Sequence, residues 1–233
     1  MKKQVRIIRL GNLDYRKAWD YQEQLFAEKL ARKTQNRDLT PEAQLPISHD
    51  LLLVEHPHVY TLGKSGKESH LLLDDAGLKA HQATYYRINR GGDITYHGPG
   101  QLVVYPILDL EQFKTDINWY LRSLEEVVIQ TIGEFGLKGE RYPGFTGVWL
   151  EADSARARKI CAMGVRTSRW VTMHGIALNV NTNLDYFKHI VPCGIDDKAV
   201  ASMATESRQP IVMEEVEDAF LRQFTSVFDV ELS

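Results

Sequence analysis

Cysteine is scarce in this sequence, and long apolar runs are missing. Among 233 residues there are two cysteines, Cys161 and Cys193, too few for a disulfide framework or a cysteine-rich zinc site. Free thiols favour a reducing compartment. The first residues lack the apolar core of about 7 to 15 residues that a signal peptide needs, and no stretch approaches the roughly 18 uncharged apolar residues of a membrane span. The sequence therefore predicts a cytoplasmic protein with no membrane partner.

A strong net charge is also missing. The formal charge is −3 at pH 7, which argues against a nucleic-acid partner, so any affinity for an acidic partner has to come from a local patch. Apolar residues make up 43% of the chain and charged residues 25%, the balance of a globular protein with a real core. Because domains usually hold about 100 to 200 residues, we expect one domain over residues 1–233.

Hydrophobic periodicity predicts clusters of strands between helices. Apolar spacings of three and four residues predict helices from Asp14 onward, from Asp116 to about Gly136, and from about Glu214. Short apolar or alternating runs predict strands at residues 4–9, 51–55, 58–62, 84–89, 102–109, 148–150, 159–166 and 171–180. Pro57 could make 51–55 and 58–62 a hairpin, and the polar segment 32–48 is predicted to be a surface connection. This pattern predicts an α+β fold of mixed sheets with packed helices.

Residues 90–101 have the sequence RGGDITYHGPGQ and hold four of the 16 glycines. Glycine adopts positive φ and allows a ligand to approach the backbone, so this density indicates either tight turns or a loop that lines a pocket. The segment matches neither the phosphate-binding pattern G-x-x-x-x-G-K-[ST] nor the dinucleotide pattern G-x-G-x-x-G. Arg90, Asp93 and His97 offer donors and a titratable group beside this backbone, which favours a functional loop.

This segment, followed by LVVYPILDL, resembles the signature of the octanoyl transferases that begin lipoate biosynthesis by moving octanoyl from acyl carrier protein to lipoyl domains. The resemblance runs from about residue 50 to residue 200 and includes TLGKSGKE and TGVW. It implies an α/β fold related to the lipoate ligase and biotin ligase catalytic domains. It also implies a tunnel for the acyl chain and its pantetheine arm, lined by Arg90, Gly91, Gly92, Asp93, Ile94, Thr95, Tyr96 and His97, by Ala162, Met163 and Gly164, and by Gly175, Ile176 and Ala177.

Cys193 lies in IVPCGI, between a proline and a glycine that predict a turn able to present the thiol to a cleft. A buried packing role is the alternative for any lone cysteine. Lys159, in RKICAMGVR, lies 34 positions earlier (193 − 159). The two residues resemble the lysine and cysteine pair of the octanoyl transferases, which implies that Cys193 is the nucleophile and Lys159 its acid and base partner.

A thiol and an amine that lie close together can share a proton, which would let this pair act in acyl transfer. Free cysteine has a pKa of about 8.5 and lysine of about 10.4, but a nearby ammonium favours the thiolate, and partial burial lowers the pKa of lysine. Cys193 would attack the acyl thioester while Lys159 protonates the departing thiol, and Lys159 would then accept a proton from the incoming lysine amine. Thioester exchange is nearly isoenergetic and amide formation runs downhill, so we expect no ATP, no metal and no other cofactor.

Three other side chains are rivals for these roles. Cys161 lies two positions after Lys159, on the same face of a strand, but family members commonly have a small apolar residue there, so we interpret Cys161 as packing. His97 and His174 are alternative bases, since Cys/His pairs are common. His174 lies in MHGIALNV, which resembles a family segment that shapes the acyl site, so shape is the favoured role for that strand.

A basic run comprises Arg156, Arg158, Lys159, Arg166 and Arg169, and no acidic residue occurs from position 154 to position 184. The run is either a solvated strand edge or a positive surface that attracts an acidic partner. The family favours the second, because its acyl donor is octanoyl-acyl carrier protein. The implied acceptors are lipoyl domains of 2-oxoacid dehydrogenase complexes and the glycine cleavage H protein.

Three alternatives remain beside octanoyl transfer through a Cys193 thioester. An ATP-dependent lipoate or biotin protein ligase on the same fold would activate a free acid as an adenylate and would need no cysteine. A lipoyl-domain amidotransferase would use the cysteine with a different donor. A binding module without catalysis would only dock on carrier proteins. The pairing of Cys193 with Lys159 favours octanoyl transfer over the ligase.

Overall fold

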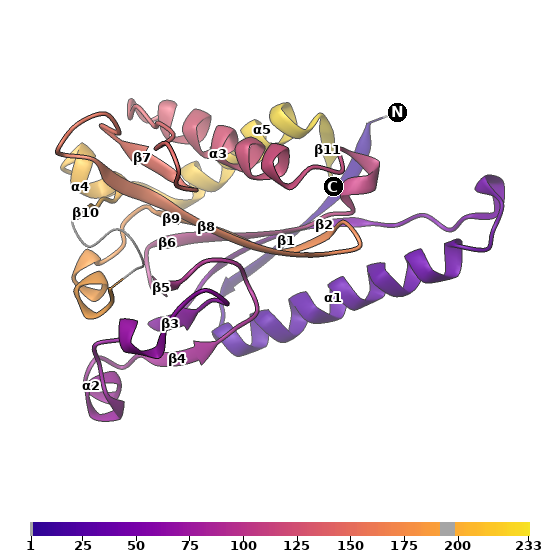
Figure 1. Ribbon diagram of the computed structural model, residues 1–233. Helices are drawn as coiled ribbons and strands as arrows, with labels where there is room; N and C mark the ends of the chain where they lie inside the picture. The colour runs from indigo at the N-terminus through magenta and orange to yellow at the C-terminus, as the bar shows by residue number, and fades with distance from the viewer. Residues whose placement is uncertain (1, 192–198) are drawn as a thin grey trace.

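Two β-sheets of unequal size organise the chain (Figure 1). The structure is a computed structural model and describes residues 2–191 and 199–233. Within these residues the α-helices are α1 (Tyr15–Asn36), α2 (Asp75–Ala80), α3 (Ile117–Gly133), α4 (Met203–Ser207) and α5 (Met213–Phe228). The strands are β1 (Lys3–Asn12), β2 (His49–Glu55), β3 (Val59–Leu62), β4 (Thr84–Arg87), β5 (Ile94–His97), β6 (Gln101–Ile107), β7 (Val148–Leu150), β8 (Arg158–Ser168), β9 (Val171–Asn179), β10 (Ala199–Val200) and β11 (Val230–Leu232).

The larger sheet has the strand order β10-β8-β9-β6-β2-β1-β11, with β7 also paired to β8. The pairs from β8 through β9 and β6 to β2 are antiparallel, whereas β1 runs parallel to both β2 and β11. The smaller sheet has the order β4-β3-β5, with one parallel and one antiparallel pair. The predicted α+β fold of mixed sheets with packed helices is therefore confirmed.

Helices cover both faces of the larger sheet (Figure 1). α3 and α5 pack on one face, where Leu124 and Phe220 join Leu178 of β9 in the main core. α1 lies on the other face and buries Leu25 and Phe26 in a second cluster. Of the helices in residues 2–191 and 199–233, none is both long and apolar enough to cross a membrane.

Two predicted helices begin where their capping residues indicate. The side chain of Asp14 accepts a hydrogen bond from the backbone N–H of Lys17 at 3.2 Å, and Asp116 accepts one from Trp119 at 3.0 Å. An N-cap carboxylate satisfies a backbone donor that the first turn leaves without an intrahelical partner. The helix starts predicted for α1 and α3 are thus confirmed.

The predicted hairpin of residues 51–55 and 58–62 is wrong. β2 lies inside the larger sheet, paired with β1 on one side and β6 on the other, while β3 belongs to the smaller sheet. Both edges of β2 are therefore occupied, and it has no free edge for β3. The turn at Pro57 carries the chain from one sheet to the other.

The predicted surface connection 32–48 is also partly wrong, because α1 continues to Asn36. Lys33 in the last turn is bound to the carboxylates of Asp109 and Glu111, each at 2.7 Å. The Asn36 side chain donates to the backbone C=O of Leu45 at 2.7 Å and accepts from its N–H at 2.9 Å. The Lys33 contacts join residues far apart in the chain and the Asn36 contacts join residues nine positions apart, so the local helical pattern did not predict either.

A buried ion pair joins α1 to the centre of the larger sheet. Lys29 of α1 binds Asp50 of β2, and the two side chains are 3% and 0% exposed. Arg6 of β1 reaches the same carboxylate at 2.7 Å. Two charges held away from water stabilise each other, but the loss of one leaves the other without compensation.

We predict that Asp50→Ala lowers the free energy of unfolding by about 3 to 5 kcal/mol, because it strands the buried Lys29 ammonium. The double variant Asp50→Leu with Lys29→Met should be less destabilised than Asp50→Ala alone. Asp20→Ala is the matched control: it breaks a pair with Arg16 whose side chains are 58% and 57% exposed, and it should cost no more than about 1 kcal/mol. Urea unfolding measures all three. A cost for Asp50→Ala as small as that of the control would contradict the prediction.

Candidate active site

A cavity of about 500 Å³ is lined by residues of both sheets. The glycine-rich segment and β5 supply one part of its wall, β8 and β9 another, and α3 and the segment before β7 a third. The residues predicted from the sequence that line it are Arg90, Gly91, Gly92, Asp93, Ile94, Thr95, His97, Lys159, Ala162, Met163, Gly164, Gly175, Ile176 and Ala177. Three segments that are far apart in the chain therefore meet around one space.

Lys159 lies near the start of β8 with its Nζ 4.7 Å from the centre of the Trp149 ring. Burial lowers the pKa of its ammonium, and the Cys161 thiol has an opposing, smaller effect on that pKa. In the part of the chain that the structure describes, no carboxylate pairs with it. An aromatic face stabilises a cation without taking its proton, so the amine stays available for proton transfer.

Gly147, in the TGVW segment, makes room for this lysine. Its φ is +121°, and a Cβ there would lie 2.5 Å from the carbonyl oxygen of Cys161 and 3.5 Å from Cε of Lys159. Its N–H donates to the buried carboxylate of Glu125 at 3.0 Å. Only glycine adopts this backbone conformation readily, so the local sequence lets β7 approach β8 where the lysine side chain passes.

Cys193 lies outside the described residues, but the residues on either side of that segment contact the cavity. Ile190 lines it before the gap, and Ala199 and Val200 line it after the gap. Val200 pairs with Lys159 in the β10–β8 ladder. The chain thus leaves and re-enters the described structure at the wall of the same cavity.

Cys161 is fully buried and lies in the main core with α3 and α5. Burial raises the pKa of its thiol well above the ordinary value. A thiol sealed from solvent and held protonated is a poor nucleophile. This placement supports the interpretation of Cys161 as a packing residue.

His97 is held by an ordered chain of amides. Asn179 donates to the carbonyl oxygen of Ala201 at 2.9 Å, Gln101 donates to Oδ1 of Asn179 at 2.9 Å, and Oε1 of Gln101 lies 2.8 Å from Nδ1 of His97. Because the carbonyl fixes the direction of each amide, Nδ1 of His97 carries the proton. Burial, together with the nearby His56, lowers the pKa of His97 well below its usual range. A ring that stays neutral is a weak base. Its hydrogen bond to Gln101 fixes its orientation in the cavity wall.

His174 departs from normal strand geometry. Its φ is +59°, and its backbone N–H donates to Oε1 of Gln22 in α1 at 3.0 Å. Pro106 of the neighbouring strand lies beside it: a Cβ on Gly175 would sit 2.7 Å from the Pro106 Cδ. Proline has no N–H to give to the ladder, and the β6–β9 pairs end at Val104 and Ile176, before this position. The His174 side chain lines the cavity. Burial lowers the pKa of His174 to about 3.

Tyr96 is the exception among the described predicted residues. It does not line the cavity and is instead buried in the smaller sheet, where its OH is hydrogen-bonded to Nδ1 of His58 at 2.7 Å and its ring stacks on Tyr186. In a strand successive side chains point to opposite faces, so Tyr96 points away from the face of Thr95 and His97. Ile94 shares the face of Tyr96 but still contacts the cavity at the start of β5. The expectation that it lines the tunnel is therefore corrected.

Sequence reasoning missed several lining residues: Tyr15, Tyr105, Ile117, Leu121, Gly144, Phe145, Thr146, Trp149, Val165, Phe187, Ile190, Ala199 and Val200. Most are apolar or aromatic side chains of ordinary helix and strand patterns, which look the same whether they face a core or a cavity. Thr146 and Trp149 belong to the TGVW segment. The resemblance of that segment to the family was the one signal that could have predicted that they line the cavity.

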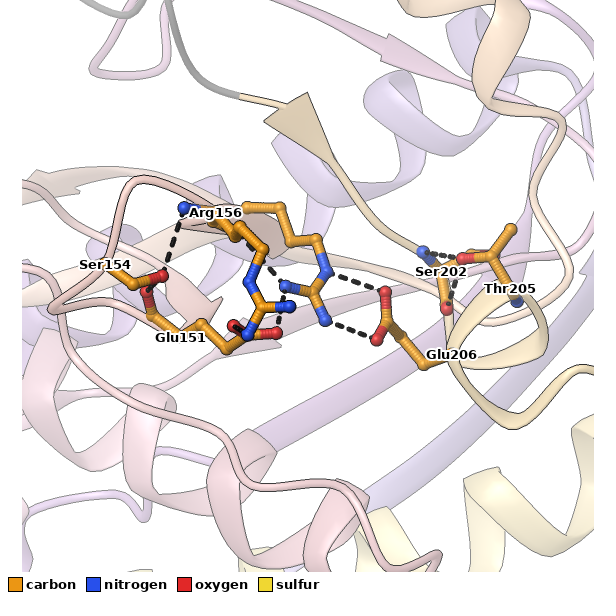
Figure 2. Close-up of polar contacts among 7 residues, drawn as sticks. Glu151, Ser154, Arg156, Ser202, Thr205 and Glu206 are labelled. Atoms are coloured by element: carbon orange, nitrogen blue, oxygen red, sulfur yellow. Dashed lines mark hydrogen bonds and ion pairs between the residues drawn. The ribbon is translucent and has the colours of Figure 1, made fainter.

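The basic run is not the free positive surface that its sequence predicts. Arg156 and Arg158 both bind Glu151, at 2.6 Å and 2.7 Å, and Arg158 also binds Glu206 of α4 at 2.5 Å. Figure 2 shows Glu151 and Glu206 facing this arginine cluster from two sides. Arg166 is likewise bound to Glu23 of α1 at 2.8 Å. Acidic side chains from other elements thus neutralise most of the run.

The described residues contain no cluster of three or more His, Cys, Asp or Glu side chains placed to hold a metal ion. The polar side chains that line the cavity include a lysine, an arginine, the carboxylate of Asp93, neutral imidazoles and hydroxyls. Such a wall combines proton donors and acceptors with a largely apolar channel.

The sequence model of the lipoyl protein ligase A/B catalytic domain matches residues 14–225. The chain belongs to this family. Within it, the chain is 57% identical to the octanoyltransferase of Christiangramia forsetii, over 100% of this chain and 99% of that one, and 55% identical to the octanoyltransferase of Cytophaga hutchinsonii, over 99% and 95%. The predicted resemblance to octanoyl transferases is confirmed, and these relatives support an acyltransferase.

A solved structure of the archaeal lipoylation system of Thermoplasma acidophilum, a bipartite lipoate protein ligase and its E2 lipoyl domain, has a chain with the same fold. The TM-score is 0.71 at 17% identity, covering 100% of this chain and 86% of that one. The predicted relation to the lipoate ligase fold is confirmed by this likeness.

We predict that Cys161 resists alkylation in the folded protein, because its thiol is buried and its pKa is raised. The Cys193→Ser variant leaves Cys161 as the one remaining thiol. Iodoacetamide at neutral pH should add no mass to the native variant and one adduct after unfolding in guanidinium. Full labelling of the native variant would show that Cys161 is accessible.

We also predict that the free energy of unfolding falls as the pH drops from about 6.5 toward 4. Burial lowers the pKa of His49 and His56 to about 4 and that of His174 to about 3. Over this window the unfolded chain binds protons that the folded chain does not, so each histidine lowers stability by roughly 1.4 kcal/mol per pH unit.

Urea unfolding at pH 7, 6 and 5 measures this slope. His56→Gln removes one titrating ring and should flatten the dependence by about one proton, although it lowers stability at every pH. An unchanged slope in His56→Gln would contradict the assignment of His56 to this effect.

Proposed function

We propose that this protein transfers an octanoyl group from octanoyl-acyl carrier protein to a lysine of a lipoyl domain, through a thioester on Cys193. The observation that carries the proposal is the placement of Lys159: a half-buried amine without an acidic partner among the described residues, in a cavity that Ile190 and Ala199 also line. The naming of relatives that match the whole chain supports the same reaction.

Chain geometry supports a meeting of Cys193 with Lys159. Cys193 follows Ile190 by three residues, so their Cα atoms can be at most roughly 11 Å apart. Val200 pairs with Lys159 and closes the same segment from the other side. Ile190 and Val200 both line the cavity that holds the lysine, which supports a meeting of the thiol with Lys159.

In the first half-reaction, the Cys193 thiolate attacks the carbonyl carbon of the carrier-bound octanoyl thioester. The bond between that carbon and the pantetheine sulfur breaks, and the departing thiolate takes a proton from the Lys159 ammonium. The products are an octanoyl-Cys193 thioester, a free pantetheine thiol and a neutral Lys159. Burial already lowers the pKa of Lys159, which makes this proton easier to give.

In the second half-reaction, a neutral lysine amine of the acceptor attacks the octanoyl-Cys193 carbonyl. Lys159 accepts the proton that the amine loses, the amide forms, and Cys193 leaves as a thiolate beside a lysine that is again an ammonium. The pair returns to its starting state, and the reaction needs no ATP and no metal. The acceptors we propose are the lipoyl domains of 2-oxoacid dehydrogenase complexes and the glycine cleavage H protein, and a thiol-dependent cycle suits a reducing cytoplasm.

An ATP-dependent ligase is the second candidate, since the fold is shared with a lipoate protein ligase. Such an enzyme would not use Cys193. The two candidates therefore differ in one covalent intermediate, which mass spectrometry can detect.

We predict that incubation with octanoyl-carrier protein adds one octanoyl group to the wild-type chain. Cys193→Ser should abolish the adduct, and Lys159→Met should slow its formation by a hundredfold or more, the usual scale of general acid and base catalysis. Intact-mass spectrometry measures the adduct, and addition of a lipoyl domain should discharge it.

Cys161→Ala is the matched control, because that thiol lies in the core, and it should still form the adduct. Mass gain that depends on ATP and free octanoate, or an adduct that survives Cys193→Ser, would overturn the proposal.

A further inference from the structure

Three buried polar atoms without hydrogen-bond partners belong to neighbouring residues at one part of the cavity. They are Nε2 of Gln22, Nε of Arg90 and Nδ1 of His174. Arg90 and His174 both line the cavity, and Gln22 binds the backbone N–H of His174. Buried polar atoms almost always have partners, so each one that lacks them asks for an explanation.

The tautomer of His174 follows from its surroundings. Glu23 is bound to Arg166 as a carboxylate, and its Oε1 accepts from Nδ2 of Asn89 at 2.9 Å. Oδ1 of Asn89 therefore faces His174, whose Nε2 lies 2.7 Å away and must donate. Burial keeps the ring neutral by lowering its pKa to about 3. Nδ1 of His174 is consequently an acceptor with no donor.

The other two atoms are donors. Oε1 of Gln22 accepts from the His174 backbone, so its Nε2 is the NH₂ group. Arg90 uses Nη1 for the carbonyl of Gly91 and Nη2 for the carbonyl and hydroxyl of Thr61, which leaves its Nε–H. The set therefore consists of two donors and one acceptor. A water molecule, which both donates and accepts, matches this set.

This polar set lies far from Lys159 along the wall of the cavity. His174 pairs with Val165 across the β8–β9 ladder, and Val165 is six residues after Lys159 in the same strand. At about 3.3 Å per residue, the two positions in β8 are roughly 20 Å apart. Because Lys159, Arg90 and His174 line the same cavity, an acyl group whose carbonyl lies beside Lys159 can extend its tail toward Arg90 and His174.

We propose that Gln22, Arg90 and His174 hold an ordered water that closes the acyl end of the cavity with a polar wall and so limits the length of the acyl chain. The length limit rests on the proposed acyl transfer, whereas the water does not. A methylene that entered this wall would displace a hydrogen-bonded water and leave buried donors and an acceptor unpaired, which costs free energy. Chain length is then selected by polarity as well as by space.

The variant Gln22→Met tests this directly, because methionine has a similar size but offers no donor. Two methylenes beyond octanoyl should then gain about 0.8 kcal/mol each. The ratio of kcat/KM for decanoyl-carrier to that for octanoyl-carrier should rise roughly tenfold over wild type. His174→Phe removes the acceptor and should raise the ratio in the same direction. A ratio taken within one variant is insensitive to partial misfolding.

Gln24→Met is the matched control, since Gln24 lies on the exposed face of the same helix, and its ratio should equal that of wild type. A high-resolution crystal structure of the wild-type protein should show a water within hydrogen-bond distance of the three atoms.

Unchanged ratios in both Gln22→Met and His174→Phe, or no density between the three atoms, would overturn the inference. If wild type formed no octanoyl adduct at all, the proposed function would fail while the crystallographic result on the water still stood.

Discussion

The cavity depends on one close contact between two backbones. The N–H of Gly91 donates to the carbonyl of Val165 at 2.9 Å, and a Cβ on Gly164 would lie 2.7 Å from the carbonyl oxygen of Gly91. Two chains can approach this closely only where a side chain is missing. The contact fastens the smaller sheet against β8, and the cavity is the space enclosed beside this seam. Gly91 of the segment 90–101 therefore holds the two sheets together and also lines the cavity.

The two adjacent cations at the start of β8 have different partners inside and outside the cavity. Neighbouring residues of a strand point to opposite faces, so Arg158 turns outward to Glu151 and Glu206 while Lys159 turns inward to Trp149. The outer cation is fixed by two carboxylates, whereas the inner one meets an aromatic face. A strand that carries two adjacent cations thus gives one a structural role and leaves the other free to lose a proton.

The sequence was most informative where a signal is local. Caps and periodicity predicted α1 and α3, and the glycine-rich motif predicted one wall of the cavity. It was least informative about contacts between residues that are far apart in the chain. The sequence near residue 57 does not indicate that β2 is paired on both sides. The sequence between positions 154 and 184 does not indicate that Glu206 and Glu23 bind the arginines. Tyr96 shows a third limit, since a motif identifies a segment but does not tell which of its side chains point into the cavity.

The parallel pairing of β11 with β1 has a consequence for how the protein is made. β11 is synthesised more than two hundred residues after its partner β1. Until then that edge of β1 exposes unpaired backbone groups, which are a template for another chain. During translation the growing chain therefore has an open sheet edge until β11 has been made, and a chaperone would have most to protect at that stage.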